Sequence, residues 1–224
     1  MGIHDGHRSR MKKRFLAHGL TSFDDHAVLE LLLFYAQPRI DTNPLAHRLI
    51  DTFGSLDAVF EASPEALMKV EGIGESAALL IHLVPEAARR YRIAKETLNG
   101  PILNADDAGR FLLPRFLNTR DETAYLVCLD PKQCVIDCRQ IGSGEPQAVS
   151  VNVRKIAETA LLQGASAVIL GHNHPNGLAL PSEADVESTR LVKNALSLLG
   201  IRLLDHIIVA GEDFVSMAES SMLP

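Results

Sequence analysis

The sequence predicts an all-α N-terminal part followed by an α/β C-terminal part, and three observations support this prediction. Residues 1–98 consist of apolar segments separated by helix caps, with no strand-like run among them. A turn-forming Thr-Leu-Asn-Gly-Pro segment follows at residues 97–101. Beyond it, short apolar runs rich in β-branched residues alternate with helical segments. We therefore expect two domains, 1–98 and 101–224.

Capping residues and a tight turn define the helices expected in the first part. Asp24 or Asp25, Asn43 and Ser63 are the expected N-caps, and proline follows two of them at the first helical position. A glycine turn at 71–74 precedes the longest helix, which Pro85 can kink. The predicted helices cover residues 10–18, 27–36, 45–53, 65–70 and 75–95.

The second part is predicted to alternate between strands and helices. Two antiparallel strands, 124–129 and 134–141, are joined at a turn that begins with Asp130 and Pro131. Asn152 caps a helix that ends at Gly164, and Ser182 begins a long helix that ends before Gly200. Two further apolar strands are expected at 167–170 and 201–209.

The composition is that of an ordinary globular protein. Of 224 residues, 46% are hydrophobic and 22% charged, which excludes a collagen-like, low-complexity or disordered chain. No apolar stretch approaches the roughly 20 residues of a membrane helix, and the charged N-terminus lacks the apolar region of a signal peptide. We expect a cytoplasmic protein without a membrane partner. The net charge of -6 argues against a surface that wraps nucleic acid throughout.

Three cysteines, Cys128, Cys134 and Cys138, cannot all pair within one chain. Their spacing also lacks the Cys-x-x-Cys pairs of a zinc ribbon or a zinc deaminase. We interpret them as small strand residues.

The strongest chemical signal is a pair of histidines at the end of the predicted strand 167–170. His172 and His174 are two residues apart, so a strand directs both imidazoles to the same side. Asp185 follows eleven residues later, on the first turn of the next helix. Two neutral histidines and one carboxylate, with a fourth position left to water, form the ligand set of a catalytic zinc site. The pattern therefore indicates hydrolysis.

Each part of this pattern also has a simpler interpretation. A His-x-His pair at a strand end is often only a pair of solvated or hydrogen-bonded histidines. Ser182 and Asp185 have the spacing of a capping box at the start of a helix. We expect that Asp185 cannot easily serve both as ligand and as cap. Under the metal interpretation the Ser182 hydroxyl is then free to donate to the oxygen of a tetrahedral intermediate.

The spacing His172-x-His174, seven residues, Ser182, two residues, Asp185 resembles the signature of JAMM zinc metallopeptidases, also called JAB or MPN+. HNHPNG at 172–177 and LLDHIIV at 203–209 resemble the RadC branch, as do N-terminal segments at 6–15, 41–50 and 53–74. The resemblance implies a cytidine-deaminase-like JAB/MPN architecture with a mixed sheet flanked by helices. It also implies Zn²⁺ held by His172, His174 and Asp185, and cleavage of a peptide or isopeptide bond in an unknown peptide or conjugate substrate.

Members of this family also use a glutamate from an earlier strand as general acid and base, and Glu122 stands at the matching position. The simpler interpretation is a solvated glutamate at a strand start. The competing residues are Glu145, in a glycine-rich loop, and Glu158, in the middle of a helix. His206 belongs to the family signature and is expected in the core or beside a ligand that it orients.

Residues 69–74, Lys-Val-Glu-Gly-Ile-Gly, resemble a helix-hairpin-helix motif, in which backbone amides approach a DNA phosphate. The alternative is a packing unit whose glycines only permit a tight turn, and the acidic Glu71 and Glu75 favour it. Two functions therefore stand. The first is a zinc hydrolase, and the second is a DNA-associated repair or recombination module whose metal site is structural or silent.

Overall fold

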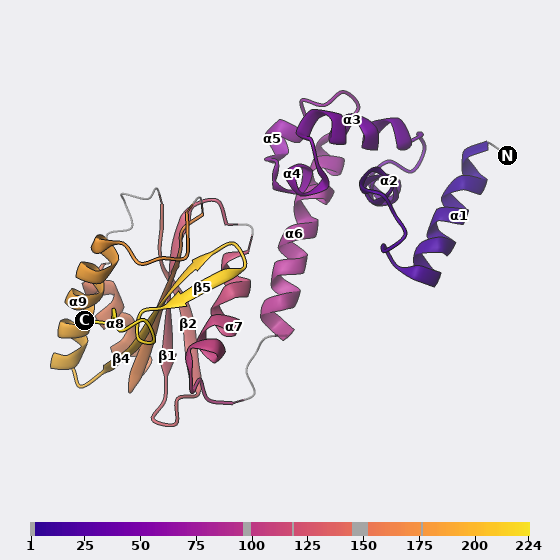
Figure 1. Ribbon diagram of the computed structural model, residues 1–224. Coiled ribbons are helices and arrows are strands. Elements are labelled where there is room, and N and C mark those ends of the chain that lie inside the picture. The colour runs from indigo at the N-terminus through magenta and orange to yellow at the C-terminus, as the bar shows by residue number, and fades with distance from the viewer. Residues whose placement is uncertain (1–2, 96–99, 118, 145–151, 176) are drawn as a thin grey trace. The chain divides into compact units, whose positions relative to one another are not determined.

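A computed structural model describes residues 3–95, 100–117, 119–144, 152–175 and 177–224 (Figure 1). Packing divides the chain into two compact units, Met1–Ala88 and Arg89–Pro224. Helices form the first unit, and the second contains a five-stranded mixed sheet with helices. The predicted fold class is therefore confirmed. The end of the first predicted domain, residue 98, lies outside the described residues.

The first unit contains two apolar cores: a smaller one between α1 and α2, and a larger one that α2, α3 and α6 share. Leu29, Leu33, Leu49 and Ile81 are fully buried in it. Ser63 caps α5 as predicted, because its side chain accepts the amide of Ala66. The helices that begin in this unit are α1 (Ile3–His18), α2 (Asp25–Ala36), α3 (Asn43–Phe53), α4 (Leu56–Glu61), α5 (Pro64–Leu67) and α6 (Glu75–Lys95), and α6 continues past the unit boundary at Ala88.

Two of the predicted caps behave differently. Asp24 does stand at the N-cap of α2, but its side chain makes no capping hydrogen bond. Asn43 is not the N-cap of α3, because Thr42 holds that position. The side-chain Nδ2 of Asn43 instead donates to the buried carboxylate of Glu30. A tertiary partner thus replaces the local one that the sequence pattern suggests.

Two helices of the first unit differ from the prediction. Helix α1 begins at Ile3 rather than at residue 10, and α4 was not predicted at all. Arg8 helps to hold α1 in place, because its guanidinium donates to the backbone oxygens of Gln37, Pro38 and Ile40. These contacts span about thirty residues of sequence, so local propensity does not reveal them.

The second unit contains a mixed sheet with strand order β2-β1-β3-β4-β5. Strand β1 pairs antiparallel with β2, as predicted, and also with β3, whereas β3 and β4 are parallel and β4 and β5 antiparallel. The strands are β1 (Glu122–Leu129), β2 (Val135–Gly144), β3 (Ala167–Asn173), β4 (Arg202–Ala210) and β5 (Asp213–Ser216).

Helices cover both faces of this sheet (Figure 1). They are α7 (Ala105–Phe116), α8 (Val153–Leu162) and α9 (Glu183–Leu198). Successive strand residues alternate between two cores. Leu126 and Leu170 pack in the core that contains Leu196 of α9, whereas Ile169 packs in the core that contains Leu112 of α7. Helix α7 therefore lies on one face, and α8 and α9 on the other.

Helix α7 and strand β5 are absent from the predicted elements. Gly109 and Pro114 lie inside α7 and lower its helix propensity, and β5 has only four residues. The three cysteines are free, and Cys134 precedes β2 by one residue rather than lying in the strand. None of the described helices combines the length and hydrophobicity that a membrane crossing requires.

The close approach of α7 to β3 yields a first prediction. A methyl group on Gly171 would lie 2.7 Å from Cδ1 of the fully buried Leu112. We expect Gly171→Ala to lower the free energy of unfolding by about 1–3 kcal/mol, because the core cannot accept the added volume without strain. Chemical denaturation measures this, with Gly100→Ala as control, since a methyl group there meets only open space. Equal stability of both variants would contradict the prediction.

Candidate metal centre

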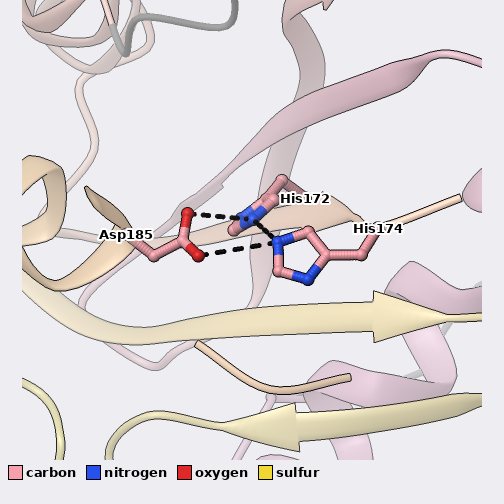
Figure 2. Close-up of side chains that lie close together, drawn as sticks. All are labelled: His172, His174 and Asp185. Carbon is pink, nitrogen blue, oxygen red and sulfur yellow. Dashed lines mark hydrogen bonds and ion pairs between the residues drawn. The ribbon is translucent and has the colours of Figure 1, made fainter. Parts of the chain in front are cut away.

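The end of β3 and the start of α9 bring three side chains together: His172, His174 and Asp185 (Figure 2). His172 is on the same face of β3 as Val168 and Leu170, which is the face that α9 covers. His174 follows the strand directly, and its amide donates to the backbone oxygen of Val209, which continues the pairing with β4. The strand thus directs both imidazoles toward the first turn of α9.

The three side chains are close enough to share one ion. One ligand atom from each residue lies within 4.8 Å of the other two, and in the described part of the chain no other group of three has this property. Nε2 of His172 is 2.9 Å from Nε2 of His174 and 3.1 Å from Oδ1 of Asp185. Nε2 of His174 lies 3.5 Å from Oδ2 of the same carboxylate.

The donor set fits a zinc ion because both Nδ1 atoms are already occupied. Nδ1 of His174 donates to the backbone oxygen of Leu178, at 3.1 Å. Nδ1 of His172 is 2.8 Å from Nε2 of His206. When the imidazole of His174 is neutral, its Nε2 therefore carries the lone pair, and this nitrogen faces the carboxylate. Two imidazole nitrogens and one carboxylate, with room for water, form a set that zinc favours.

Thiolates do not compete for this role. Cys128 is buried in the sheet, and burial together with the nearby Asp137 raises the pKa of its thiol to about 11. Metals bind the thiolate rather than the thiol, so a thiol with a raised pKa is a poor ligand. The histidines and the aspartate are therefore the suitable ligands.

Asp185 forms the capping box with Ser182 and at the same time directs one oxygen to His172, although we expected the cap to compete with a role as ligand. Its Oδ1 faces His172, while its Oδ2 accepts the backbone amide of Ser182 at 2.8 Å. Ser182 in turn accepts the amide of Asp185, which completes the capping box. A carboxylate has two oxygens, so the cap and the approach to His172 do not compete. Burial raises the pKa of Asp185, but the hydrogen bond and the positive charge of a protonated His172, together with hydrogen bonds from Ser182, lower it by more, so the net pKa is well below its usual range.

The hydroxyl of Ser182 is therefore not free in this structure. Its Oγ donates to Oδ2 of Asp185 at 2.6 Å while accepting the amide of the same residue. These contacts fix the carboxylate in the orientation that Figure 2 shows. Donation from Ser182 to a reacting oxygen would require the hydroxyl to turn away from Asp185.

The strand register places Glu122 at the same end of the sheet. Ala124 pairs with His172 in the antiparallel ladder, so Glu122 is level with His174. Because alternate strand residues share a face, Glu122 lies on the face of His172. Glu158 instead forms an exposed ion pair with Arg154 on α8, at 2.7 Å. Glu145 lies outside the described residues.

Asn173 is a residue that the sequence did not single out. It lies between the two histidines, faces the side of the sheet opposite to theirs and is only 4% exposed. Its Oδ1 accepts the amide of Thr123 at 2.7 Å, and its Nδ2 donates to Thr119 Oγ1 and to the backbone oxygen of Asp121. These bonds hold the chain on both sides of Glu122. The partners lie about fifty positions away in sequence, so no local signal reveals them.

The predicted helix-hairpin-helix turn has a packing explanation at one of its two glycines. Gly72 has a φ of +90°, and a Cβ there would lie 2.5 Å from Leu45 Cδ2. Val70 and Ile73 are buried in the helical core on either side. At Gly74 the structure shows no steric reason for glycine, since a Cβ would meet open space.

Fold and site together define a JAB-type α/β domain preceded by a helical unit. Comparison with known proteins matches residues 102–222 to the RadC-like JAB domain. A UPF0758 protein of Fusobacterium nucleatum is 32% identical over 227 residues, covering 97% of both chains. A UPF0758 protein of Marinobacter nauticus is 33% identical and covers 96% of both. The chain therefore belongs to the RadC-like JAB domain family, as the sequence motifs predicted.

The hydrogen bonds by which Asn173 holds the chain on both sides of Glu122 yield a second prediction. In Asn173→Ala the amide of Thr123 loses its acceptor, so we expect its hydrogen exchange to accelerate. Asn173→Asp keeps an acceptor oxygen but loses the donor to Thr119 and Asp121, so Thr123 should stay protected while stability falls by about 1–3 kcal/mol. Residue-resolved hydrogen exchange measures the difference. The same exchange rate at Thr123 in the wild type, Asn173→Ala and Asn173→Asp would show that Asn173 does not hold this segment in place.

Proposed function

We propose that this protein is a zinc-dependent hydrolase that cleaves a peptide or isopeptide bond. The observation that supports this most is the convergence of Nε2 of His172, Nε2 of His174 and the carboxylate of Asp185 at the end of β3. Glu122 lies two residues before Ala124, the strand partner of His172, on the same face of the sheet, and we assign it the role of general acid and base. Membership of the RadC-like JAB family agrees with a hydrolytic role.

Each residue of the site has a distinct task in the proposed reaction. Zn²⁺ held by His172, His174 and Asp185 would supply Lewis acidity that lowers the pKa of a bound water to about 7. Glu122 would accept the proton of that water and deliver it to the leaving amine. Ser182 orients the Asp185 carboxylate and, after its hydroxyl turns, would donate to the oxygen of the tetrahedral intermediate.

Zinc content tests the ligand assignment directly. We expect purified wild-type protein to bind about one zinc per chain and His174→Ala to lose it, because two remaining protein ligands hold zinc weakly. Atomic emission measures the metal, and His47→Ala is the matched control, since His47 is an exposed histidine of the helical unit. Equal zinc in wild type and His174→Ala would remove the site assignment.

The role of Glu122 is tested by a variant that leaves the ligands intact. Glu122→Gln should keep its zinc but lose hydrolysis by about 10²–10⁴-fold, because it can no longer carry the proton. The assay incubates zinc-loaded protein with a peptide library and a library of isopeptide-linked conjugates and detects newly formed termini by mass spectrometry. Glu158→Gln, in the exposed pair with Arg154, should retain full activity.

Three outcomes of that assay differ in meaning. Loss of hydrolytic activity in Glu122→Gln, with full activity in Glu158→Gln, supports the mechanism. Full activity in Glu122→Gln would show that another group carries the proton. Zinc binding without cleavage of either library by the wild type would contradict the proposed reaction and favour a structural or silent metal.

DNA binding by the helical unit has less support. Two basic side chains of α1, although exposed, already lie over aromatic rings: Arg14 is 4.2 Å from the ring centre of Phe23, and Lys12 is 5.1 Å from that of Tyr35. Gly72 is explained by its contact with Leu45. The alternative of a DNA-associated module therefore rests on the sequence resemblance alone.

A further inference from the structure

A buried chain of hydrogen bonds connects His172 to the backbone of Asp185 by a second route. Nδ1 of His172 is 2.8 Å from Nε2 of His206 on β4. Nδ1 of His206 is 2.6 Å from Oγ1 of Thr189 on α9. Oγ1 of Thr189 donates to the backbone oxygen of Asp185, one helical turn earlier. The two candidate ligands are thus joined both across the metal position and behind it.

The direction of each hydrogen bond in this chain follows from the number of available protons. A threonine hydroxyl has one proton, and a carbonyl oxygen can only accept it. Thr189 therefore donates to Asp185 and must accept from Nδ1 of His206. The other polar neighbour of the hydroxyl, Sδ of Met217 at 3.7 Å, is a much weaker acceptor than a carbonyl.

The tautomer of His206 decides which nitrogen of His172 can bind a metal. With its proton on Nδ1, a neutral His206 has an unprotonated Nε2, which accepts from Nδ1 of His172. Nε2 of His172 is then the only ring nitrogen available as a ligand, and it is the one that faces Asp185. The reverse arrangement would place the proton of His172 on the ligating nitrogen.

The surroundings of this chain keep its proton arrangement well defined. Thr189 is fully buried and His206 is 3% exposed, so solvent offers little competition for their hydrogen bonds. The His206 ring donates to Thr189 with one nitrogen and accepts from His172 with the other, so the direction of the first hydrogen bond determines that of the second.

We propose that Thr189 and His206 are positioning residues that fix the proton of His172 on Nδ1 and so prepare its Nε2 for zinc. The effect on zinc rests on the proposed function, whereas the proton arrangement does not. Outer hydrogen-bond partners of metal ligands typically change metal affinity by about 10–100-fold when they are lost. Because Thr189 and Asp185 share one helix, the same hydroxyl also links the orientation of His172 to the first turn of α9.

Nitrogen-15 NMR of the histidine rings in the metal-free, full-length protein tests the proton arrangement without requiring zinc. From the hydrogen-bond geometry we expect the proton of His206 on Nδ1, and a proton on Nδ1 of His172. In Thr189→Val the acceptor is lost, so the His206 proton should move to Nε2. A wild-type His206 protonated on Nε2, or no change in Thr189→Val, would overturn the proposal.

Zinc affinity, measured by competition with a chelator, provides the second readout. Thr189→Val should bind zinc about 10–100-fold more weakly, and Thr189→Ser, which retains the hydroxyl, should restore it. Thr159→Val is the matched control, because Thr159 also donates to a carbonyl one turn earlier, that of Lys155, but on α8. If His172 and His206 carry their protons as expected but the wild type binds no zinc, the proposed function is refuted while the proton arrangement stands. Unchanged affinity in Thr189→Val, with zinc bound by the wild type, would refute the positioning role.

Discussion

The pairing of β3 with β1 and β4 is the constraint on which the rest of the site depends. All seven residues of β3 are buried, and its two neighbours hold it in antiparallel and parallel register. A strand that is paired on both sides cannot rotate about its axis. Because side chains alternate along a strand, His172 faces α9 and Asn173 faces the opposite side of the sheet. One face of the strand end thus supplies the candidate ligands, and the other supports the segment that carries Glu122. A slip of one residue would exchange these two faces.

The start of α9 shows how helix geometry and site geometry can use the same atoms. Hydrogen bonds with Ser182 in the capping box hold the side chain of Asp185 in one orientation. In this orientation one carboxylate oxygen is directed to His172. A carboxylate that is already ordered loses little conformational entropy when a cation binds. Thr189, one turn later, ties the same helix to His206 and through it to the other ring nitrogen of His172. The site is therefore preorganised by secondary structure rather than by loops.

The sequence was sufficient for the parts of the structure that local patterns encode. The spacing of His172, His174 and Asp185 indicated a shared site because strand and helix periodicities are regular, and the same periodicity located most strands. Helix α7 was missed because Gly109 and Pro114 contradict its propensity, although packing against the sheet stabilises it. The hydrogen bonds of the Asn173 and Asn43 side chains were missed because their partners, Thr123 and Glu30, are distant in sequence. The expected competition between cap and ligand at Asp185 treated the carboxylate as a single acceptor, whereas in the structure one oxygen faces His172 while the other completes the capping box.

X-ray absorption of the zinc-loaded protein tests the central claim most directly, because it counts the atoms around the metal. The account predicts two imidazole nitrogens at about 2.0–2.1 Å, oxygens at about 2.0–2.2 Å from Asp185 and water, and no sulfur. Substitution of Asp185 by asparagine should alter the oxygen shell and leave both imidazoles in place. A sulfur ligand at about 2.3 Å, or a first shell without two imidazoles, would contradict the site built by β3 and α9.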